Sequence, residues 1–138
     1  MQKLRVLVAD DRQEVRWAVT RMLSECFEIV GSVTDGQKLV AAAQSLSPHV
    51  IVSDVDMPLL TGPEAIRVLG ARGLNIPVVL MSAYITDAEQ YIEAGATAVV
   101  DKIDIGYDLA VAIRAANDGQ TYLSRSLRLS SNFRMVPA

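Results

Sequence analysis

The stretch Val50–Gly62, with the sequence VIVSDVDMPLLTG, indicates how the rest of the chain is arranged. Its first three residues are apolar and predict a short buried strand. Asp54 follows that strand, and Pro58 and Gly62 interrupt regular structure after it. Open α/β sheets bind ligands at the carboxyl ends of their strands, so Asp54 is a candidate site residue. This stretch alone is equally compatible with an Asp54 that only caps a turn.

Four further apolar segments predict strands that alternate with helices. The predicted strands are Leu4–Ala9, Glu28–Val33, Pro77–Met81 and Thr97–Val100. The first predicted helix has an apolar stripe at Val15, Ala18, Val19, Met22 and Leu23. The second is capped by Thr34–Asp35, and the third begins at Gly62–Pro63. The fourth is short, from Thr86 or Asp87 to Gly95, and the fifth spans about Gly106–Asp118. The alternation predicts an α/β three-layer sandwich with a parallel sheet. Its βα units favour the flavodoxin-like (βα)5 topology with strand order 2-1-3-4-5.

The composition is typical of one compact domain, because 51% of the 138 residues are hydrophobic and 21% are charged. A net charge of -3 gives no global sign of nucleic-acid binding. Acidic residues end at Asp118, whereas several arginines follow. We therefore expect a domain over residues 1–121, and a basic tail or the start of a linker over 122–138. The chain has no signal-peptide pattern and no run of membrane-spanning length, so we expect a cytoplasmic location.

Three residues that each occur once have simple expected roles. Cys26 has no partner for an internal disulfide and is expected to be a buried thiol at the end of an apolar helix. His49 is expected to be a turn residue and not a metal ligand or base. Trp17 lies off the apolar stripe of the first predicted helix, so it is either plain surface or part of a partner face.

Polar side chains follow four of the predicted strands at the point where each strand ends. These are Asp10 and Asp11 after the first strand, Asp54 after the third, Ser82 after the fourth and Lys102 after the fifth. In the expected strand order these ends meet at one edge of the sheet. Singly, each residue could be a helix cap, a turn residue or a solvated charge. Together they favour a functional site, in which three carboxylates lie beside a hydroxyl and an ammonium group.

Clustered carboxylates repel one another and require a cation. Their oxygen atoms suit Mg²⁺, whereas a zinc site would need Cys or His ligands. An additional Lys and Ser indicate that a phosphoryl group binds there. The sequence has no glycine-rich phosphate loop, and neither Cys nor His is placed to act as nucleophile. A carboxylate is therefore the predicted nucleophile, with Asp54 as the central candidate.

Over residues 3–124 the chain resembles a response regulator receiver domain of a two-component system, with a CheY-like fold. The matching motifs are Val8-Ala9-Asp10-Asp11, Ser53-Asp54-Val55-Asp56-Met57-Pro58 with Thr61-Gly62, Met81-Ser82-Ala83, Gly95-Ala96 and Lys102. The resemblance implies that Asp54 accepts a phosphoryl group from a sensor histidine kinase or a small phosphodonor. It implies Mg²⁺ bound by Asp11, by Asp54 and by the backbone carbonyl of Asp56, with Asp10 acting through water. Ser82 and Lys102 would then hold the phosphoryl oxygens.

The segment Gly119–Ser124 is similar to receivers of the NarL/LuxR type, which control transcription. Members of that type bind DNA through a separate C-terminal domain, and we expect such an output domain to lie outside this chain. Phosphorylation is expected to permit homodimerisation, and no membrane partner is expected. The sequence leaves open the kinase, the output, the dimer face and whether Ala138 is a natural end.

The chain departs from the receiver pattern at two places. Lys102 is followed by Ile103-Asp104, where many receivers have Pro next. The aromatic switch residue expected three positions before the Lys is Val99, and Ala98 replaces the common Gly. We therefore expect signalling through repacking of the fourth helix without an aromatic rotation. Tyr84, two residues after Ser82, is expected to be a loop residue over the site.

Two other functions compete with this interpretation. Asp54-Val55-Asp56 resembles the Asp-x-Asp motif of haloacid-dehalogenase-type phosphatases, in which the second Asp is the general acid. That motif normally lies on the first strand, and the Asp10–Asp11 pair has no role in it. A degenerate interaction module without phosphorylation is the other alternative, and Val99 is the feature that favours it.

Overall fold

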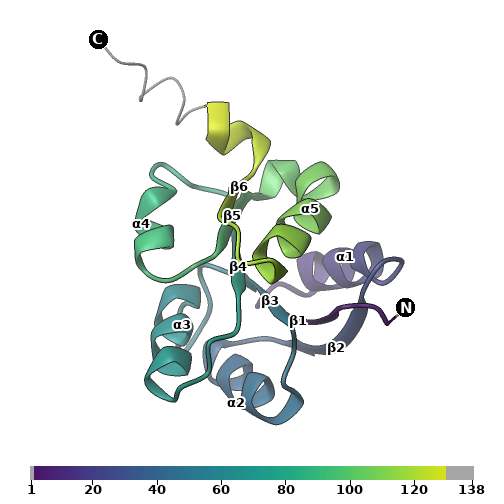
Figure 1. Cartoon of the computed structure of the whole chain (residues 1–138), viewed down its shortest axis with the longest axis vertical. Coiled ribbons are helices and arrows are strands. Elements are labelled where there is room, and N and C mark those ends of the chain that lie inside the picture. The colour runs from purple at the N-terminus through teal and green to yellow at the C-terminus, as the bar shows by residue number, and fades with distance from the viewer. Residues whose placement is uncertain (1, 130–138) are drawn as a thin grey trace.

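The computed structural model describes residues 2–129, which form a six-stranded parallel sheet between two layers of helices (Figure 1). The strands, in their order across the sheet, are β2 (Glu28–Val33), β1 (Arg5–Ala9), β3 (Val50–Asp54), β4 (Val78–Ser82), β5 (Ala98–Asp101) and β6 (Tyr122–Leu123). The predicted α/β class and the flavodoxin-like order 2-1-3-4-5 are confirmed. The structure adds β6 at the edge, paired in parallel with β5.

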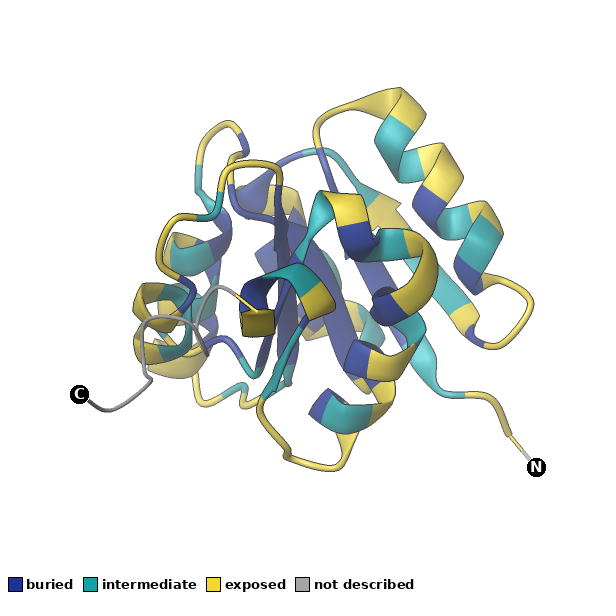
Figure 2. Ribbon diagram, turned by 90° about the horizontal axis from the view of Figure 1, so that it is seen from above, coloured by how far each residue is buried: buried dark blue, intermediate teal, exposed yellow. Residues whose placement is uncertain are grey.

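Two separate apolar cores hold the helices on the sheet. Helices α1 (Gln13–Leu23) and α5 (Ile105–Asn117) cover one face, where they pack on alternate residues of β1, β3, β4 and β5. Helices α2 (Gly36–Leu46), α3 (Gly62–Ala71) and the short α4 (Glu89–Glu93) cover the other. Figure 2 shows the central strands buried between helices whose outer sides are exposed. Strands covered on both faces must be apolar throughout, as β3 and β4 largely are.

Local signals explain where two of the helices begin. The carboxylate of Asp35 accepts a hydrogen bond from the backbone N–H of Lys38 and caps α2 as predicted. Thr61 and Glu64 form a reciprocal capping box at the start of α3, with Pro63 in its first turn. Because α3 begins at a fixed residue, the loop that joins it to Asp54 has a fixed length.

Several expected boundaries differ from the structure by one residue. Strands β4 and β5 extend to Ser82 and Asp101, since sheet hydrogen bonding continues past the apolar residues that signal a strand. Ala18, expected on the buried stripe of α1, is exposed. Residues 122–129, which carry no predicted element, form β6 and a helical turn over 125–129. The division of the chain at residues 121 and 122 stays a prediction.

The prediction of a buried Cys26 is wrong, because its thiol is exposed. Helix α1 ends at Leu23, and Cys26 lies in the turn that follows. Phe27 takes the buried position instead, at 3% exposure.

His49 lies in a turn as expected, at the edge of the sheet opposite the carboxyl ends, where its Nδ1 accepts a hydrogen bond from the backbone N–H of Arg5. Among residues 2–129, no helix has the length and apolar character needed to cross a membrane.

Candidate functional site

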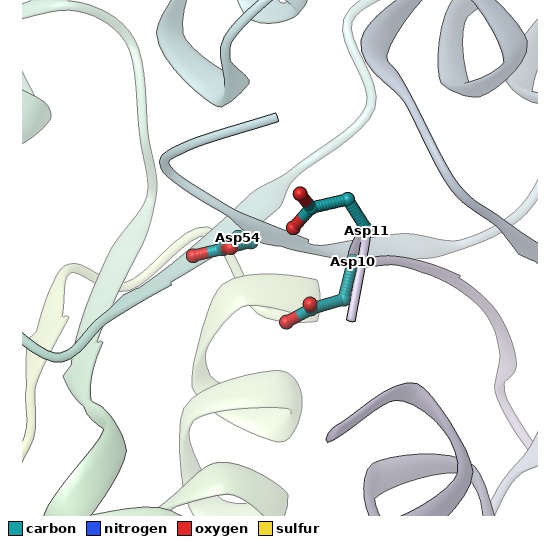
Figure 3. Close-up of side chains that lie close together, drawn as sticks. All are labelled: Asp10, Asp11 and Asp54. Atoms are coloured by element: carbon teal, nitrogen blue, oxygen red, sulfur yellow. The ribbon is translucent and has the colours of Figure 1, made fainter. Parts of the chain in front are cut away.

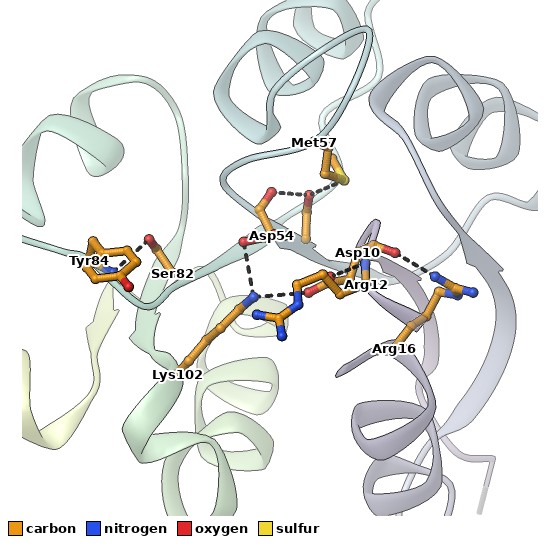
Figure 4. A network of polar contacts seen from close by, with 9 residues as sticks. Asp10, Arg12, Arg16, Asp54, Met57, Ser82, Tyr84 and Lys102 are labelled. Atoms are coloured by element: carbon orange, nitrogen blue, oxygen red, sulfur yellow. Dashed lines mark hydrogen bonds and ion pairs between the residues drawn. The ribbon is translucent and has the colours of Figure 1, made fainter. Parts of the chain in front are cut away.

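The carboxyl ends of four strands bring the predicted site residues together at one edge of the sheet. The strand register places Asp54 beside Met81 and Ser82 beside Asp101, and Asp10 and Asp11 follow directly after β1. Lys102 follows β5 and reaches back across this edge (Figure 4). Residues separated by as many as 92 positions in sequence therefore meet in one place.

Three carboxylates form a group that could hold a metal ion. Asp10, Asp11 and Asp54 each offer an oxygen atom, and these atoms lie within 4.8 Å of one another (Figure 3). Asp10 and Asp54 are buried, whereas Asp11 is exposed to solvent. An all-oxygen donor set with one open side fits a hard divalent cation that retains water ligands, so the residues present suit Mg²⁺.

Lys102 provides the positive charge that pairs with the two buried carboxylates of this cluster. Its Nζ lies 3.2 Å from Oδ2 of Asp10 and 3.4 Å from Oδ1 of Asp54. Asp10 is completely buried, and an unpaired buried carboxylate would be strongly destabilising. The ammonium group therefore compensates both buried carboxylates while it remains at the edge of the pocket.

Asp54 has an unusual protonation equilibrium for an aspartate. Burial raises its pKa to about 6, and the negative charge of Asp10 acts in the same direction. The ammonium group of Lys102 and the backbone N–H of Asp56 lower the pKa but do not outweigh burial. The charge of Asp54 therefore responds to pH in the range around 6.

Asp10 is held rigidly by groups from the start of α1. Its Oδ1 accepts a hydrogen bond of 2.9 Å from the backbone N–H of Arg12, and the guanidinium group of Arg16 donates to its carbonyl oxygen at 2.9 Å. Its own N–H donates to the carbonyl of Val33 on β2. Both the backbone and the carboxylate of Asp10 are consequently fixed relative to the sheet.

Ser82 lies buried at the end of β4, on the side of the pocket away from Asp10 (Figure 4). Its Oγ accepts a hydrogen bond of 3.2 Å from the backbone N–H of Tyr84. Because Oγ acts here as an acceptor, the hydroxyl proton is available to an oxygen atom in the pocket. The Tyr84 side chain is 88% exposed, in agreement with its expected place in a loop over the site.

These residues line a pocket of about 250 Å³. Its lining consists of the predicted Asp11, Asp54, Asp56, Ser82, Tyr84 and Lys102, together with Arg12 and Ala83. Sequence reasoning assigned no role to Arg12, and its position directly after the Asp10–Asp11 pair is the signal that could have found it. A larger cavity of about 450 Å³ lies between the ends of α3 and α4 at the opposite edge. The lining of the larger cavity contains one charged residue, Arg67. The smaller pocket combines carboxylates, a hydroxyl and an ammonium group, so it is the better candidate for a functional site.

The loop between β3 and α3 is fixed by backbone contacts. The N–H of Gly62 donates to the carbonyl of Val55 at 2.8 Å, and the N–H of Gly36 donates to the carbonyl of Pro58 at 3.3 Å. The hydroxyl of Ser53 donates to the carbonyl of Asp54 at 2.9 Å. Asp56 is exposed at the start of this loop, next to the pocket.

Val99 occupies the position at which an aromatic switch residue was expected. It is completely buried in the core on the α4 side of the sheet, which also contains Leu80, Ala88 and Ala96. A valine lacks an aromatic ring that could rotate between a buried and an exposed position.

A family model, curated relatives and solved structures all agree on the family to which this chain is similar. The family model described as a response regulator receiver domain matches residues 6–114. The chain is 34% identical over 125 residues to the response regulator GacA of Pseudomonas protegens, covering 88% of this chain and 59% of that protein. It is 35% identical over 125 residues to the transcriptional regulatory protein LiaR of Bacillus subtilis, covering 87% and 59%.

The chain thus spans about three fifths of the length of these curated relatives. Among solved structures, the signal receiver domain of the response regulator NarL from Mycobacterium tuberculosis aligns with a TM-score of 0.74 at 26% identity, over 83% of this chain and 98% of that domain. The likeness to the NarL receiver agrees with the resemblance to NarL/LuxR-type receivers that the Gly119–Ser124 segment suggested. Two-component systems use such domains as phosphorylation-dependent switches, and the chain belongs to the response regulator receiver domain family.

Proposed function

We propose that Asp54 accepts a phosphoryl group from a sensor histidine kinase or a small phosphodonor, and that the modified domain switches conformation to control an output. One observation carries this proposal: a buried carboxylate whose pKa is raised lies 3.4 Å from a lysine ammonium group in a pocket with two further carboxylates. This combination provides a nucleophile, a counter-charge and a place for a cation.

In the proposed reaction an oxygen of Asp54 attacks phosphorus in line with the leaving group. The bond from phosphorus to the donor breaks, and its electron pair leaves with the donor. Lys102 offsets negative charge on the phosphoryl oxygens, and the hydroxyl of Ser82 donates a hydrogen bond to one of them. Asp11, Asp54 and the backbone carbonyl of Asp56, with Asp10 acting through water, would hold Mg²⁺, which would supply further positive charge to the phosphoryl group.

The proposed switch begins when the phosphoryl group draws Ser82 inward and shifts the loop after β4. Helix α4 is five residues long and none of them is fully buried, although Tyr91 and Ile92 pack against the core, so less packing energy opposes its movement than that of the longer helices. With Val99 at the switch position, repacking of α4 takes the place of an aromatic rotation. The phosphoryl group selects one of two existing states, until water hydrolyses the acyl phosphate. Asp56 and Tyr84 lie at positions suited to modulate that hydrolysis.

The test is incubation of the protein with acetyl phosphate and Mg²⁺, followed by mass spectrometry of the intact chain. We expect a gain of one phosphoryl group per chain, and no gain when Mg²⁺ is removed by a chelator. A protein that gains no mass under these conditions contradicts the proposal. Steady turnover of a phosphomonoester substrate would instead favour the phosphatase alternative.

Binding of Mg²⁺ should depend on pH in a way set by Asp54. Its pKa of about 6 means that below this pH a proton occupies the carboxylate and competes with the metal ion. We expect the affinity to rise about tenfold per pH unit up to pH 6 and to level off above about pH 7, measured by isothermal titration calorimetry. Equal affinities at pH 5 and pH 7 would contradict the assignment of Asp54 as a ligand, and Asp54→Asn should remove the dependence.

The outward side of α1 is the proposed contact for the kinase. Trp17 is 64% exposed there, and an apolar groove between α1 and α5, lined by Val15, Met22 and Ile105, leads to Lys102. Trp17→Ala should slow phosphotransfer from the cognate kinase about tenfold, as loss of an interface aromatic does. The rate with acetyl phosphate serves as the control and should not change. An equal loss with both donors would contradict the assignment.

The proposed output is control of transcription, the role that the name of LiaR gives for that protein. DNA would be bound by a separate output domain and not by the receiver domain, since the chain as a whole has a net charge of -3. Homodimerisation on phosphorylation is part of the same proposal.

A further inference from the structure

Two buried carboxylates at the start of α5 belong neither to the pocket nor to the apolar cores. Asp104 and Asp108 are 9% and 4% exposed, and both face the C-terminal segment over residues 122–129. Asp104 follows Ile103, the residue that stands after Lys102 where many receivers have Pro. Figure 1 shows this segment at the edge of the sheet beyond β5 and beside α5.

Asp104 accepts three hydrogen bonds from the segment. The donors to its Oδ2 are the hydroxyl of Ser124 at 2.7 Å, and the hydroxyl and the backbone N–H of Ser126 at 2.7 and 3.0 Å. Asp108 accepts two more, from the hydroxyl of Tyr122 at 2.9 Å and from the backbone N–H of Arg125 at 2.8 Å. The first N–H groups of the helical turn over 125–129 are thus capped by Asp104 and Asp108 and not by a side chain near them in sequence.

Ser124 also contacts Asp101, the residue that precedes Lys102. The fully buried Oγ of Ser124 accepts a hydrogen bond of 2.9 Å from the backbone N–H of Asp101 while it donates to Asp104. The backbone N–H of Ser124 donates to the carbonyl of Val99 at 3.0 Å. Asp101 pairs with Ser82 across β4 and β5. The segment is therefore bonded to the short turn Lys102–Asp104, whose two ends carry the Lys102 ammonium group and the Asp104 carboxylate.

We propose that Asp104, Asp108 and Ser124 form a latch that couples the phosphorylation state of Asp54 to the C-terminal segment. The proposal rests on the function proposed above. A phosphoryl group extends farther from Asp54 than its carboxylate does, so Lys102 must leave its present position between Asp10 and Asp54 to contact it. The turn that carries Lys102 moves with it, and the hydrogen bonds of Ser124 to Asp101 and Asp104 lose their geometry.

The coupling gives this chain a route to its output that needs no aromatic residue at position 99. Phosphorylation weakens the latch, and residues 122–129 open more often. By thermodynamic reciprocity, a variant with a weakened latch must bind a mimic of the phosphoryl group more tightly, by up to the factor by which that mimic weakens the latch. A latch with only a structural role would affect stability but not that affinity.

The first test is hydrogen exchange of the Arg125 and Ser126 amides, followed by NMR in the unmodified protein and after treatment with acetyl phosphate and Mg²⁺. We expect exchange to be about 5-fold faster or more after phosphorylation, the size of a typical coupling between sites. The amide of Asp118, bonded to the end of α5, is the internal control and should not change. Unchanged exchange in a sample whose mass shows full phosphorylation overturns the latch alone. A sample that gains no phosphoryl group overturns the latch and the proposed function together.

The second test uses Ser124→Ala, with Ser24→Ala as the matched control. Both remove a serine hydroxyl that is hydrogen-bonded to the backbone, but the hydroxyl of Ser24 donates to the carbonyl of Thr20 at the end of α1, far from the latch. We expect Ser124→Ala to bind beryllium trifluoride with Mg²⁺ about 5-fold more tightly than the unchanged chain, and Ser24→Ala to bind it equally well. Should Ser124→Ala destabilise the fold too strongly, Ser126→Ala removes one contact to Asp104 and leaves the bridge to Asp101 in place. An unchanged affinity in folded latch variants overturns the proposal.

Discussion

Asp54→Asn should reduce phosphoryl uptake from acetyl phosphate to background, a loss of the whole mass gain. An amide nitrogen or oxygen at this position is a much weaker nucleophile than a carboxylate oxygen, and the phosphoacceptor charge disappears. The substitution is nearly isosteric, and a neutral side chain resembles the protonated form that burial already favours, so the fold should be retained. Intact-mass measurement after incubation with Mg²⁺ and acetyl phosphate provides the readout.

Asp56→Asn is the control for this experiment. Asp56 is an exposed carboxylate two residues away, and its proposed contribution is a backbone carbonyl that the substitution leaves in place. We expect the Asp56 variant to gain one phosphoryl group, with an altered lifetime. A mass gain that survives in Asp54→Asn, or that is lost equally in both variants, would refute the assignment of Asp54 as the acceptor.

Gly62→Ala should destabilise the fold strongly, although the added group is a single methyl. A Cβ at this position would lie 2.6 Å from the carbonyl oxygen of Asp54 and 2.8 Å from Cδ2 of Leu80. The Asp54 carbonyl belongs to the central strand and cannot move aside, so the free energy of unfolding should fall by about 3 kcal/mol. Because the clash displaces Asp54 itself, phosphorylation of the folded fraction should also slow.

Gly70→Ala in the same helix is the matched control. A Cβ there has no neighbouring atom within 4 Å, and replacing glycine inside a helix removes backbone freedom from the unfolded chain. The free energy of unfolding should rise by about 0.5–1 kcal/mol, and phosphorylation should be unaffected. Urea denaturation of both variants gives the comparison. A Gly62→Ala protein as stable as the unchanged chain would contradict the tight approach of α3 to Asp54.

The sequence by itself determined strands β1 to β5, the five helices and the candidate residues that meet at the carboxyl edge of the sheet, because these depend on local signals. Strands β3 and β4 are short apolar runs that end in polar residues, and α2 and α3 begin at caps formed within a few residues. Once such units alternate, a parallel sheet must collect Asp10, Asp54 and Lys102 at one edge. Their number and type could therefore be predicted without knowing a single distance.

The tertiary structure decided what depends on contacts between distant residues. It determined that Lys102 bridges Asp10 and Asp54, and that burial outweighs this ammonium group in setting the pKa of Asp54. The exposure of Cys26 depends on where the turn after α1 points, which no periodicity encodes. The two-residue strand β6 is too short to leave a pattern, and it forms because β5 offers a free edge and because Asp104 and Asp108 hold the residues after it. Local patterns specify which groups are available, and only packing fixes which of them meet and in what charge state.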